Sequence, residues 1–190
     1  MDPHLAKRDK IMFYKYLDGC KHYFEYGSGG STYQASIRPN MVKIYSVESD
    51  KAWQTVLQER TDPSKITFFY NEMGTLPRTW GNPGPTATLD QKRNYSEFMR
   101  KLPRAEQRAI DLVLIDGRFR VACCLKCFDL IRPDCLIAFD DFLNRPGYHV
   151  VLGYYDMVEK TSDNRMVILR KKKNVAVPPE LILQTELVAG

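Results

Sequence analysis

Long hydrophobic segments are missing from this chain. No apolar run reaches the roughly 18 residues that a membrane-spanning helix requires, and residues 1–10 carry several charges where a secretory signal would be apolar. We therefore expect a soluble protein in the cytoplasm, which for a viral protein would be the cytoplasm of the host. With 190 residues, 44% of them hydrophobic, the chain has enough apolar side chains for one core, so a single domain over 1–190 is expected.

Cysteine and histidine are too sparse, and wrongly spaced, for a zinc site or a disulfide framework. The five cysteines are an odd number, and the pair Cys124-x-x-Cys127 has no second pair or histidine at ligand spacing. Three cysteines fall in one expected helix, which is not how disulfide-stapled proteins are built. We expect all five to be reduced thiols packed in the core. They are Cys20, Cys123, Cys124, Cys127 and Cys135.

A strong excess of one charge is also missing. The formal net charge is +5, and much of it comes from residues 7–10 and 170–173. Aromatic residues do not alternate with these basic residues as a base-stacking surface requires, so a nucleic-acid partner is not expected. A mildly basic rim suits an anionic small molecule such as a nucleotide sugar.

Apolar segments with the period of strands alternate with segments that have the period of helices. Strands are expected at 22–26, 42–47, 65–70, 109–115, 135–139, 153–161 and 165–171. Helices are expected at 5–18, 31–37, 50–59, 95–102 and 118–131. Residues 71–94, rich in Gly and Pro, form an irregular loop, and 162–164 a hairpin turn. The pattern predicts an α/β, Rossmann-like three-layer sandwich, whose mostly parallel seven-stranded sheet ends in a C-terminal antiparallel hairpin.

A glycine turn directly follows the first expected strand. Residues 27–30 read Gly-Ser-Gly-Gly, and a turn of this composition lets the backbone approach a ligand without Cβ clashes. The next helix then points its N-terminal amides at that ligand. Glu48 closes the second strand 21 residues after Gly27, and one carboxylate accepts both hydroxyls of a ribose diol. These residues predict a nucleotide or nucleoside site.

Acidic side chains follow two further strands. Asp116 follows the strand at 109–115, and Asp140 and Asp141 follow the strand at 135–139. The carboxyl ends of parallel strands share a crevice, so these three carboxylates would repel one another without a positive charge between them. A divalent cation, Mg²⁺ or Mn²⁺, is the simplest such charge. In the alternative, Asp140 caps a turn and Asp116 pairs with Arg118 or Arg120.

The order of these motifs carries a family resemblance. The motifs are Glu-x-Gly-x-Gly-Gly at 25–30, Val-Glu at 47–48, Asp-Leu-Val-Leu-Ile-Asp-Gly at 111–117 and Leu-Ile-Arg-Pro-Asp-Cys-Leu-Ile-Ala-Phe-Asp-Asp at 130–141. Over residues 20–172 the chain resembles class I S-adenosylmethionine-dependent methyltransferases. Within them it is similar to catechol O-methyltransferase and the macrolide-sugar O-methyltransferases, and segments 115–117 and 140–142 look closer to the sugar enzymes.

The resemblance implies a cofactor, a metal and a division of roles. S-adenosylmethionine would be the methyl donor, and Asp116, Asp140 and Asp141 would hold the divalent cation that binds the acceptor's hydroxyls. The methyl acceptor would be a small molecule or glycan with hydroxyl groups, and Arg118 and Arg120 would contact a phosphate on it. The cofactor-binding residues implied are Glu25, Gly27, Ser28, Gly29, Ser31, Thr32, Glu48, Asn71 and Asp116.

One position departs from the family pattern. The catechol enzymes carry a lysine base three residues after the first metal-binding aspartate, and here that position is Phe119. The candidate bases are Asp140, Asp141 and His149, and a metal ion would lower the demand on any of them.

Three other functions remain as alternatives. A Rossmann oxidoreductase would need a third glycine where Thr32 stands, and a Tyr-x-x-x-Lys pair that the sequence lacks. Nucleic-acid amino-methyltransferases resemble one another in an Asn/Asp-Pro-Pro-aromatic segment after the fourth strand. Here residues 116–119 read Asp-Gly-Arg-Phe instead. A non-catalytic nucleoside-binding module would leave the acidic strand ends unused. The sequence therefore favours O-methylation of a sugar or glycan hydroxyl, with a catechol-like acceptor as the alternative.

Overall fold

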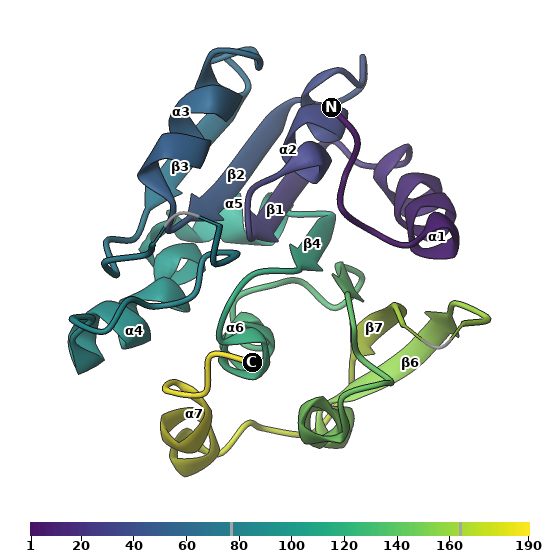
Figure 1. Ribbon diagram of the computed structural model, residues 1–190. Helices are drawn as coiled ribbons and strands as arrows, with labels where there is room; N and C mark the ends of the chain where they lie inside the picture. The colour runs from purple at the N-terminus through teal and green to yellow at the C-terminus, as the bar shows by residue number, and fades with distance from the viewer. Residues whose placement is uncertain (77, 164) are drawn as a thin grey trace.

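A seven-stranded sheet with strand order β3-β2-β1-β4-β5-β7-β6 lies at the centre of the computed structural model (Figure 1). The structure describes residues 1–76, 78–163 and 165–190. The strands are β1 (His22–Tyr26), β2 (Lys43–Glu48), β3 (Ile66–Tyr70), β4 (Leu112–Ile115), β5 (Leu136–Phe139), β6 (Tyr155–Lys160) and β7 (Val167–Lys171). Neighbours from β3 to β5 run parallel, and β7 runs antiparallel to both β5 and β6. The expected fold class is confirmed.

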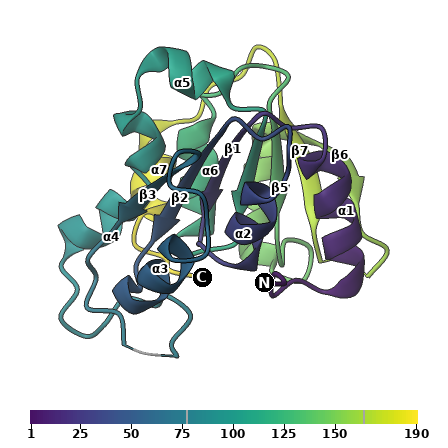
Figure 2. The same cartoon turned by 90° about the horizontal axis from the view of Figure 1, so that it is seen from above.

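Helices cover both faces of the sheet, as Figures 1 and 2 show. The α-helices are α1 (Lys7–Leu17), α2 (Gly30–Ser36), α3 (Lys51–Gln58), α4 (Leu89–Tyr95), α5 (Arg104–Ala109), α6 (Arg120–Cys127) and α7 (Pro179–Thr185). Two 3₁₀ helices are η1 (Phe98–Lys101) and η2 (Pro146–Gly153). Helices α1, α2 and α3 lie on one face, and α5, α6 and α7 on the other. None of the described helices is long and apolar enough to cross a membrane.

Alternation along the strands divides the core between the two faces. In β4, Leu112 and Leu114 pack into the cluster under α1 and α2, while Val113 and Ile115 pack into the larger cluster under α6. Successive strand side chains point to opposite faces, so a run that is apolar throughout marks a strand covered on both sides. All five cysteines are buried and free, and Cys123, Cys124 and Cys127 lie in the larger cluster.

The largest differences from the sequence-based expectations lie between β3 and β4. The expected loop 71–94 and helix 95–102 are replaced by a loop, α4 and η1, and the start of the expected strand at 109–115 belongs to α5. Helix α4 begins at a capping box in which Thr88 and Gln91 exchange hydrogen bonds with each other's backbone N–H. Two expected loop residues, Pro77 and Asn164 of the hairpin turn, lie outside the described residues.

Candidate active site

The strand order reverses between β1 and β4, and the turns after these two strands are in contact. A Cβ on Gly27, whose φ is 97°, would lie 2.7 Å from the Gly117 nitrogen, and one on Gly117 would lie 2.9 Å from the Gly27 nitrogen. A side chain at either position would therefore clash with the backbone of the other turn, so both positions require glycine. In open α/β sheets a crevice for ligands forms at such a reversal, outside the carboxyl ends of the strands.

The other two glycines of the turn differ from each other. A Cβ on Gly30 would lie 2.3 Å from backbone atoms of Asp2, because the N-terminal segment crosses the start of α2. Gly29 has only the Ser31 hydroxyl near its Cβ position, at 3.9 Å. Gly29 is therefore the glycine of this turn that leaves room for a ligand against the backbone.

Glu25 lies beneath the glycine turn and is completely buried. Its Oε2 accepts hydrogen bonds from Tyr23 (2.9 Å) and Ser31 (2.7 Å), and its Oε1 accepts from Ser46 (2.7 Å) and Thr32. Burial raises the pKa of Glu25, and the four hydroxyl donors oppose that shift. The Ser31 and Thr32 hydroxyls, expected to face the cofactor, instead face this carboxylate. Ser28 Oγ likewise lies 2.5 Å from Ser46 Oγ.

Glu48, at the end of β2, is buried but has one oxygen to spare. Its Oε1 accepts from the backbone N–H groups of Ser49 (2.6 Å) and Asp50 (2.8 Å). No hydrogen bond to its Oε2 is present within the described ranges, and the Ser28 backbone amide lies near enough to act on the pKa of the carboxyl as well. Burial raises the pKa of Glu48 to about 7, while the amides of Asp50 and Ser49 act to lower it. This half-satisfied carboxylate has the arrangement that the expected ribose contact requires.

The end of β3 is used for internal contacts. Asn71, expected to bind the cofactor, donates to the Gln91 carbonyl (2.9 Å) and accepts from Asn94 (2.5 Å), which fixes α4 against the sheet. Further along the loop, the Ser49 hydroxyl donates to the Gly81 carbonyl (3.1 Å). Trp80 is 69% exposed, and its ring lies 4.7 Å from that of His4. The loop after β3 therefore reaches across to Ser49, beside Glu48.

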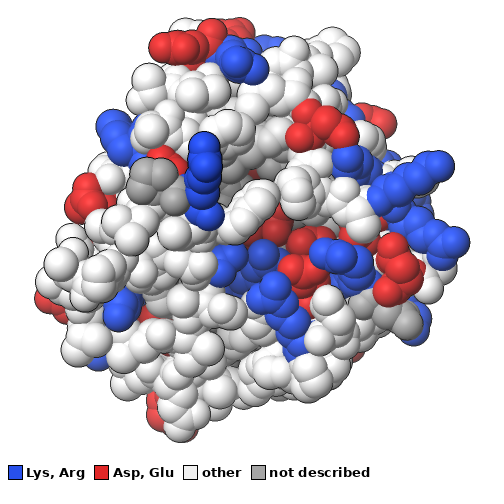
Figure 3. Space-filling view, viewed as in Figure 1, with Lys and Arg blue, Asp and Glu red and all other residues white. Residues whose placement is uncertain are grey.

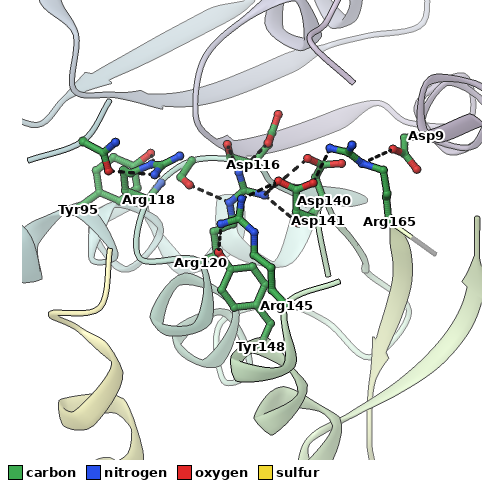
Figure 4. Close-up of polar contacts among 12 residues, drawn as sticks. Asp9, Tyr95, Asp116, Arg118, Arg120, Asp140, Asp141, Arg145, Tyr148 and Arg165 are labelled. Atoms are coloured by element: carbon green, nitrogen blue, oxygen red, sulfur yellow. Dashed lines mark hydrogen bonds and ion pairs between the residues drawn. The ribbon is translucent and has the colours of Figure 1, made fainter. Parts of the chain in front are cut away.

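The three aspartates after β4 and β5 converge on one arginine, as Figure 4 shows. Nη2 of Arg120 lies 3.1 Å from Asp116 Oδ1, and its Nη1 lies 3.6 Å from Asp140 Oδ2 and 3.9 Å from Asp141 Oδ2. The guanidinium also donates to the carbonyls of Gly117 (2.9 Å), Asp140 (2.8 Å) and Asp116 (3.2 Å). Arg120 is 4% exposed, so these contacts are made away from water.

This arrangement does not support the expected metal centre. The positive charge that the three aspartates require is supplied by the Arg120 guanidinium, which occupies the position between them. Across residues 1–76, 78–163 and 165–190, no group of three or more His, Cys, Asp or Glu side chains is arranged to hold a metal ion. The alternative of an ion pair between Asp116 and Arg120 is the one observed.

Burial dominates the protonation of this cluster. Burial, and next the Asp116 carboxylate, raises the pKa of Asp140 to about 8, against the charge of Arg120. Burial also raises the pKa of Asp116. One proton between these two carboxylates satisfies both shifts, because two like charges close together do not both ionise readily. Asp140 Oδ1 is buried without a hydrogen-bond partner within the described ranges.

Asp141 is held by two further arginines and adopts a left-handed backbone conformation. Its φ is 56°, and its carboxylate accepts from Arg165 (2.6 Å) and Arg145 (3.0 Å). Arg145 also donates to the Tyr148 hydroxyl (2.9 Å). Phe119, after β4, has a similar φ of 52°. Such conformations cost about 1–3 kcal/mol in non-glycine residues and cluster at functional sites.

Two candidate residues lie outside this charge cluster. His149 Nε2 donates to the Phe142 carbonyl (3.2 Å), so the structure does not bring His149 into the carboxylate network. Arg118 donates to Asn82 (3.0 Å) and lies beside Tyr95, on the side of the cluster away from Asp140 and Asp141 (Figure 4). Figure 3 shows the acidic groups at the bottom of a hollow on this face, with basic side chains around them.

Several contact residues were missed by the sequence analysis. They are Asp2, His4, Asp9, Tyr95, Arg145, Tyr148 and Arg165. Arg145 and Tyr148 lie further along the segment after β5, Tyr148 within η2, so the rule that strand ends share a crevice indicates their region but not the residues themselves. Asp9 and Arg165 meet at 3.7 Å, and no local signal predicts that contact across the chain.

Comparisons with known proteins give likeness in structure rather than sequence. No family model matches the chain, and no curated protein matches it significantly. A methyltransferase-like protein from Silicibacter pomeroyi superposes over 100% of this chain and 98% of its own, with a TM-score of 0.84 and 23% identity.

More distant likenesses include an RNA methyltransferase from Salinibacter ruber, solved with S-adenosyl-L-homocysteine, at a TM-score of 0.53 and 11% identity over 93% of this chain and 97% of its own. A proposed caffeoyl-CoA O-methyltransferase from Staphylococcus aureus matches at a TM-score of 0.52 and 14% identity over 90% and 86%. The chain therefore has the Rossmann-like fold of methyltransferases.

Proposed function

We propose that this protein is an S-adenosylmethionine-dependent methyltransferase. The observation that carries the proposal is the half-satisfied Glu48 carboxylate at the end of β2, beside a glycine turn in which Gly29 stays open. A ribose diol needs an acceptor of this kind, and the backbone at Gly29 has room for the amino-acid part of the cofactor. The bound cofactor would supply a methyl group activated by its sulfonium charge.

The finer proposal is transfer to a hydroxyl oxygen. Asp140 has a buried oxygen without a partner among the described residues and a pKa raised by burial to about 8. Once Asp140 has lost the proton that it shares with Asp116, which becomes favourable above about pH 8, its carboxylate accepts the hydroxyl proton more readily than an ordinary one, and Arg120 holds it in place. The acceptor oxygen would bond to the methyl carbon while the carbon–sulfur bond of the sulfonium breaks and S-adenosylhomocysteine leaves, and Asp140 would take the hydroxyl proton.

A metal ion has no step in this mechanism, because the donor set expected to hold it does not fit one. Arg120 stands between the three carboxylates, and its contacts with Asp116 and Asp140 would have to break before a cation could bind them. The sugar or glycan acceptor rests on the sequence resemblance of segments 115–117 and 140–142. Catechol-like phenols are the alternative acceptors.

The proposal is tested by the transfer of labelled methyl groups from S-adenosylmethionine. The acceptor panel would contain free sugars, sugar phosphates, nucleotide sugars, catechols and RNA, each with EDTA and with Mg²⁺. We expect transfer to a sugar-containing acceptor that persists in EDTA. Transfer to RNA alone would reject the small-molecule acceptor. Loss of all transfer in EDTA would show that the reaction requires a divalent cation.

A further inference from the structure

Two arginines two residues apart have opposite electrostatic surroundings. Arg120 contacts three carboxylates, whereas Arg118 has no acidic partner within 4.0 Å in the described part of the chain. The Arg118 side chain is half-buried, its Nε has no hydrogen-bond partner there, and its one side-chain hydrogen bond goes to the neutral Asn82. Even a half-buried cation is costly to leave without a counter-ion, so this position is suited to receive a negative charge.

The surroundings of Arg118 make its charge harder to keep. Burial, followed by the positive charge of Arg120, lowers the pKa of Arg118, and the charge of Arg145 acts in the same direction. The nearby aspartates do not compensate, because Asp116 and Asp140 pair with Arg120, and Asp141 is bound by Arg145 and Arg165. The uncompensated positive charge of the site is thus concentrated at Arg118.

A cavity of about 330 Å³ lies next to the hydrogen-bond partner and the chain neighbour of this arginine. Its lining consists of Asn82, Pro83, Lys92, Phe119, Leu187 and Ala189. Asn82 is the residue that holds Arg118, and Phe119 is its neighbour in the chain. Lys92 brings a second cation, for which the described residues provide no ion pair. The volume suits a small ligand or part of a larger one.

The walls of the cavity are fixed by contacts that do not involve a ligand. The Phe119 amide donates to the Ala189 carbonyl (3.2 Å), which places the C-terminal segment beside the start of α6. The buried Lys126 ammonium binds Glu97 (2.5 Å) and Glu186 (2.7 Å), and so ties that segment to α6 and η1. Lys92 therefore lines a preformed space, and Arg118 lies beside two of its wall residues, Asn82 and Phe119.

Resting on the proposed function, we propose that the methyl acceptor carries an oxyanion, a phosphate or a carboxylate, which Arg118 and Lys92 bind at this cavity. A guanidinium and an ammonium both recognise oxyanions through charge-assisted hydrogen bonds, and the guanidinium can engage two oxygens at once. Arg118 follows β4, as does Asp116 of the catalytic cluster, so an acceptor anchored here would lie beside the same strand end.

The test is a calorimetric titration of inorganic phosphate, and separately of acetate, into protein saturated with S-adenosylhomocysteine. Wild type would be compared with Arg118→Gln, Lys92→Gln and the control Arg60→Gln, which removes an equal charge from an exposed position after α3. We expect Arg118→Gln to weaken anion binding at least tenfold and Lys92→Gln at least threefold, with Arg60→Gln within twofold of wild type. Tighter binding of phosphate than acetate would identify a phosphorylated acceptor, and the reverse a carboxylated one.

Two results would overturn the inference while leaving the proposed function intact. One is S-adenosylhomocysteine binding by wild type with anion affinity unchanged in both Arg118→Gln and Lys92→Gln. The other is a tenfold loss of S-adenosylhomocysteine affinity in Arg118→Gln, which would assign this arginine to the cofactor. Failure of the wild-type protein to bind S-adenosylhomocysteine would reject the proposed function itself.

Discussion

The two halves of the strand-end crevice are built on different principles. After β1 and β2, the turn at Gly29 is open and Glu48 leaves one carboxylate oxygen unused. After β4 and β5, three aspartates are neutralised by Arg120 and by the arginines that bind Asp141. The first half leaves its polar groups available to a ligand, and the second fixes its charges internally. We infer that the first half binds the cofactor and that the second positions a base.

Arg120→Gln gives the largest expected change, because it removes the internal counter-ion of the second half. Asp116 and Asp140 would lose their cation, while Asp141 keeps Arg145 and Arg165. Breaking a buried ion pair in this way costs about 3–5 kcal/mol. Urea unfolding measures the loss. Arg100→Gln is the control, since Arg100 is exposed and, among the described residues, pairs only with Glu97 (3.0 Å), so its effect should stay within about 0.5 kcal/mol. Equal effects of the two variants would contradict the role given to Arg120.

Asp140→Asn separates catalysis from cofactor binding. The variant keeps the side-chain shape but cannot accept the hydroxyl proton, so turnover should fall by about a hundredfold or more. Its affinity for S-adenosylhomocysteine should stay within twofold of wild type. The exposed Asp134→Asn serves as the control and should behave as wild type in both measurements. Loss of cofactor affinity in Asp140→Asn would contradict the division between the two halves.

Gly27→Ala and Gly29→Ala sharpen the comparison within one turn. Gly27 has a φ of 97° and touches Gly117, so an added Cβ should destabilise the fold by about 1–3 kcal/mol. Gly29 has space around its Cβ position, so its variant should change stability by less than about 0.5 kcal/mol. Thermal unfolding and calorimetry would show whether Gly29→Ala loses cofactor affinity instead. A large loss of stability in Gly29→Ala would argue against an open turn.

The pH dependence of cofactor affinity gives the smallest expected effect. Burial raises the pKa of Glu48 to about 7, so below that pH the carboxyl is protonated and accepts ribose hydroxyls less well. Affinity for S-adenosylhomocysteine should therefore rise with pH, by about tenfold from pH 6 to pH 8, and then level off. Glu48→Gln should abolish this dependence. If the affinity of the wild-type protein did not change with pH, the Glu48 carboxylate would not be part of the cofactor site.

The sheet was largely predictable from the sequence, because its strands are apolar runs bounded by turn residues. β1 was predicted with the observed bounds, and β4 was recognised from Leu112–Ile115 although its start was placed too early. The helices between β3 and β4 were not predicted in place. The Thr88-x-x-Gln91 capping box was a readable signal for α4 that the glycines and prolines around it obscured.

The positions of the acidic residues were predictable, but their partners were not. Strand ends identify Glu48, Asp116 and Asp140 as neighbours of one crevice, whatever the identity of the intervening chain. Which cation neutralises the aspartates depends on the side-chain direction of Arg120 at the start of α6, and spacing alone allowed either an arginine or a metal. Similarly, the Glu25 carboxylate accepts hydrogen bonds from four hydroxyl groups. The sequence motif does not show that these hydroxyls point toward Glu25.

The most direct test of the account is a calorimetric titration of S-adenosylmethionine, with NAD⁺ as the comparison, into wild-type protein and Glu48→Gln at pH 8. We expect micromolar binding of S-adenosylmethionine to wild type, at least tenfold weaker binding to the variant, equal stability of the two proteins and no binding of NAD⁺. Binding of NAD⁺ alone, or equal affinity of both proteins for S-adenosylmethionine, would contradict the assignment of Glu48 and the open glycine turn to a methyltransferase cofactor site.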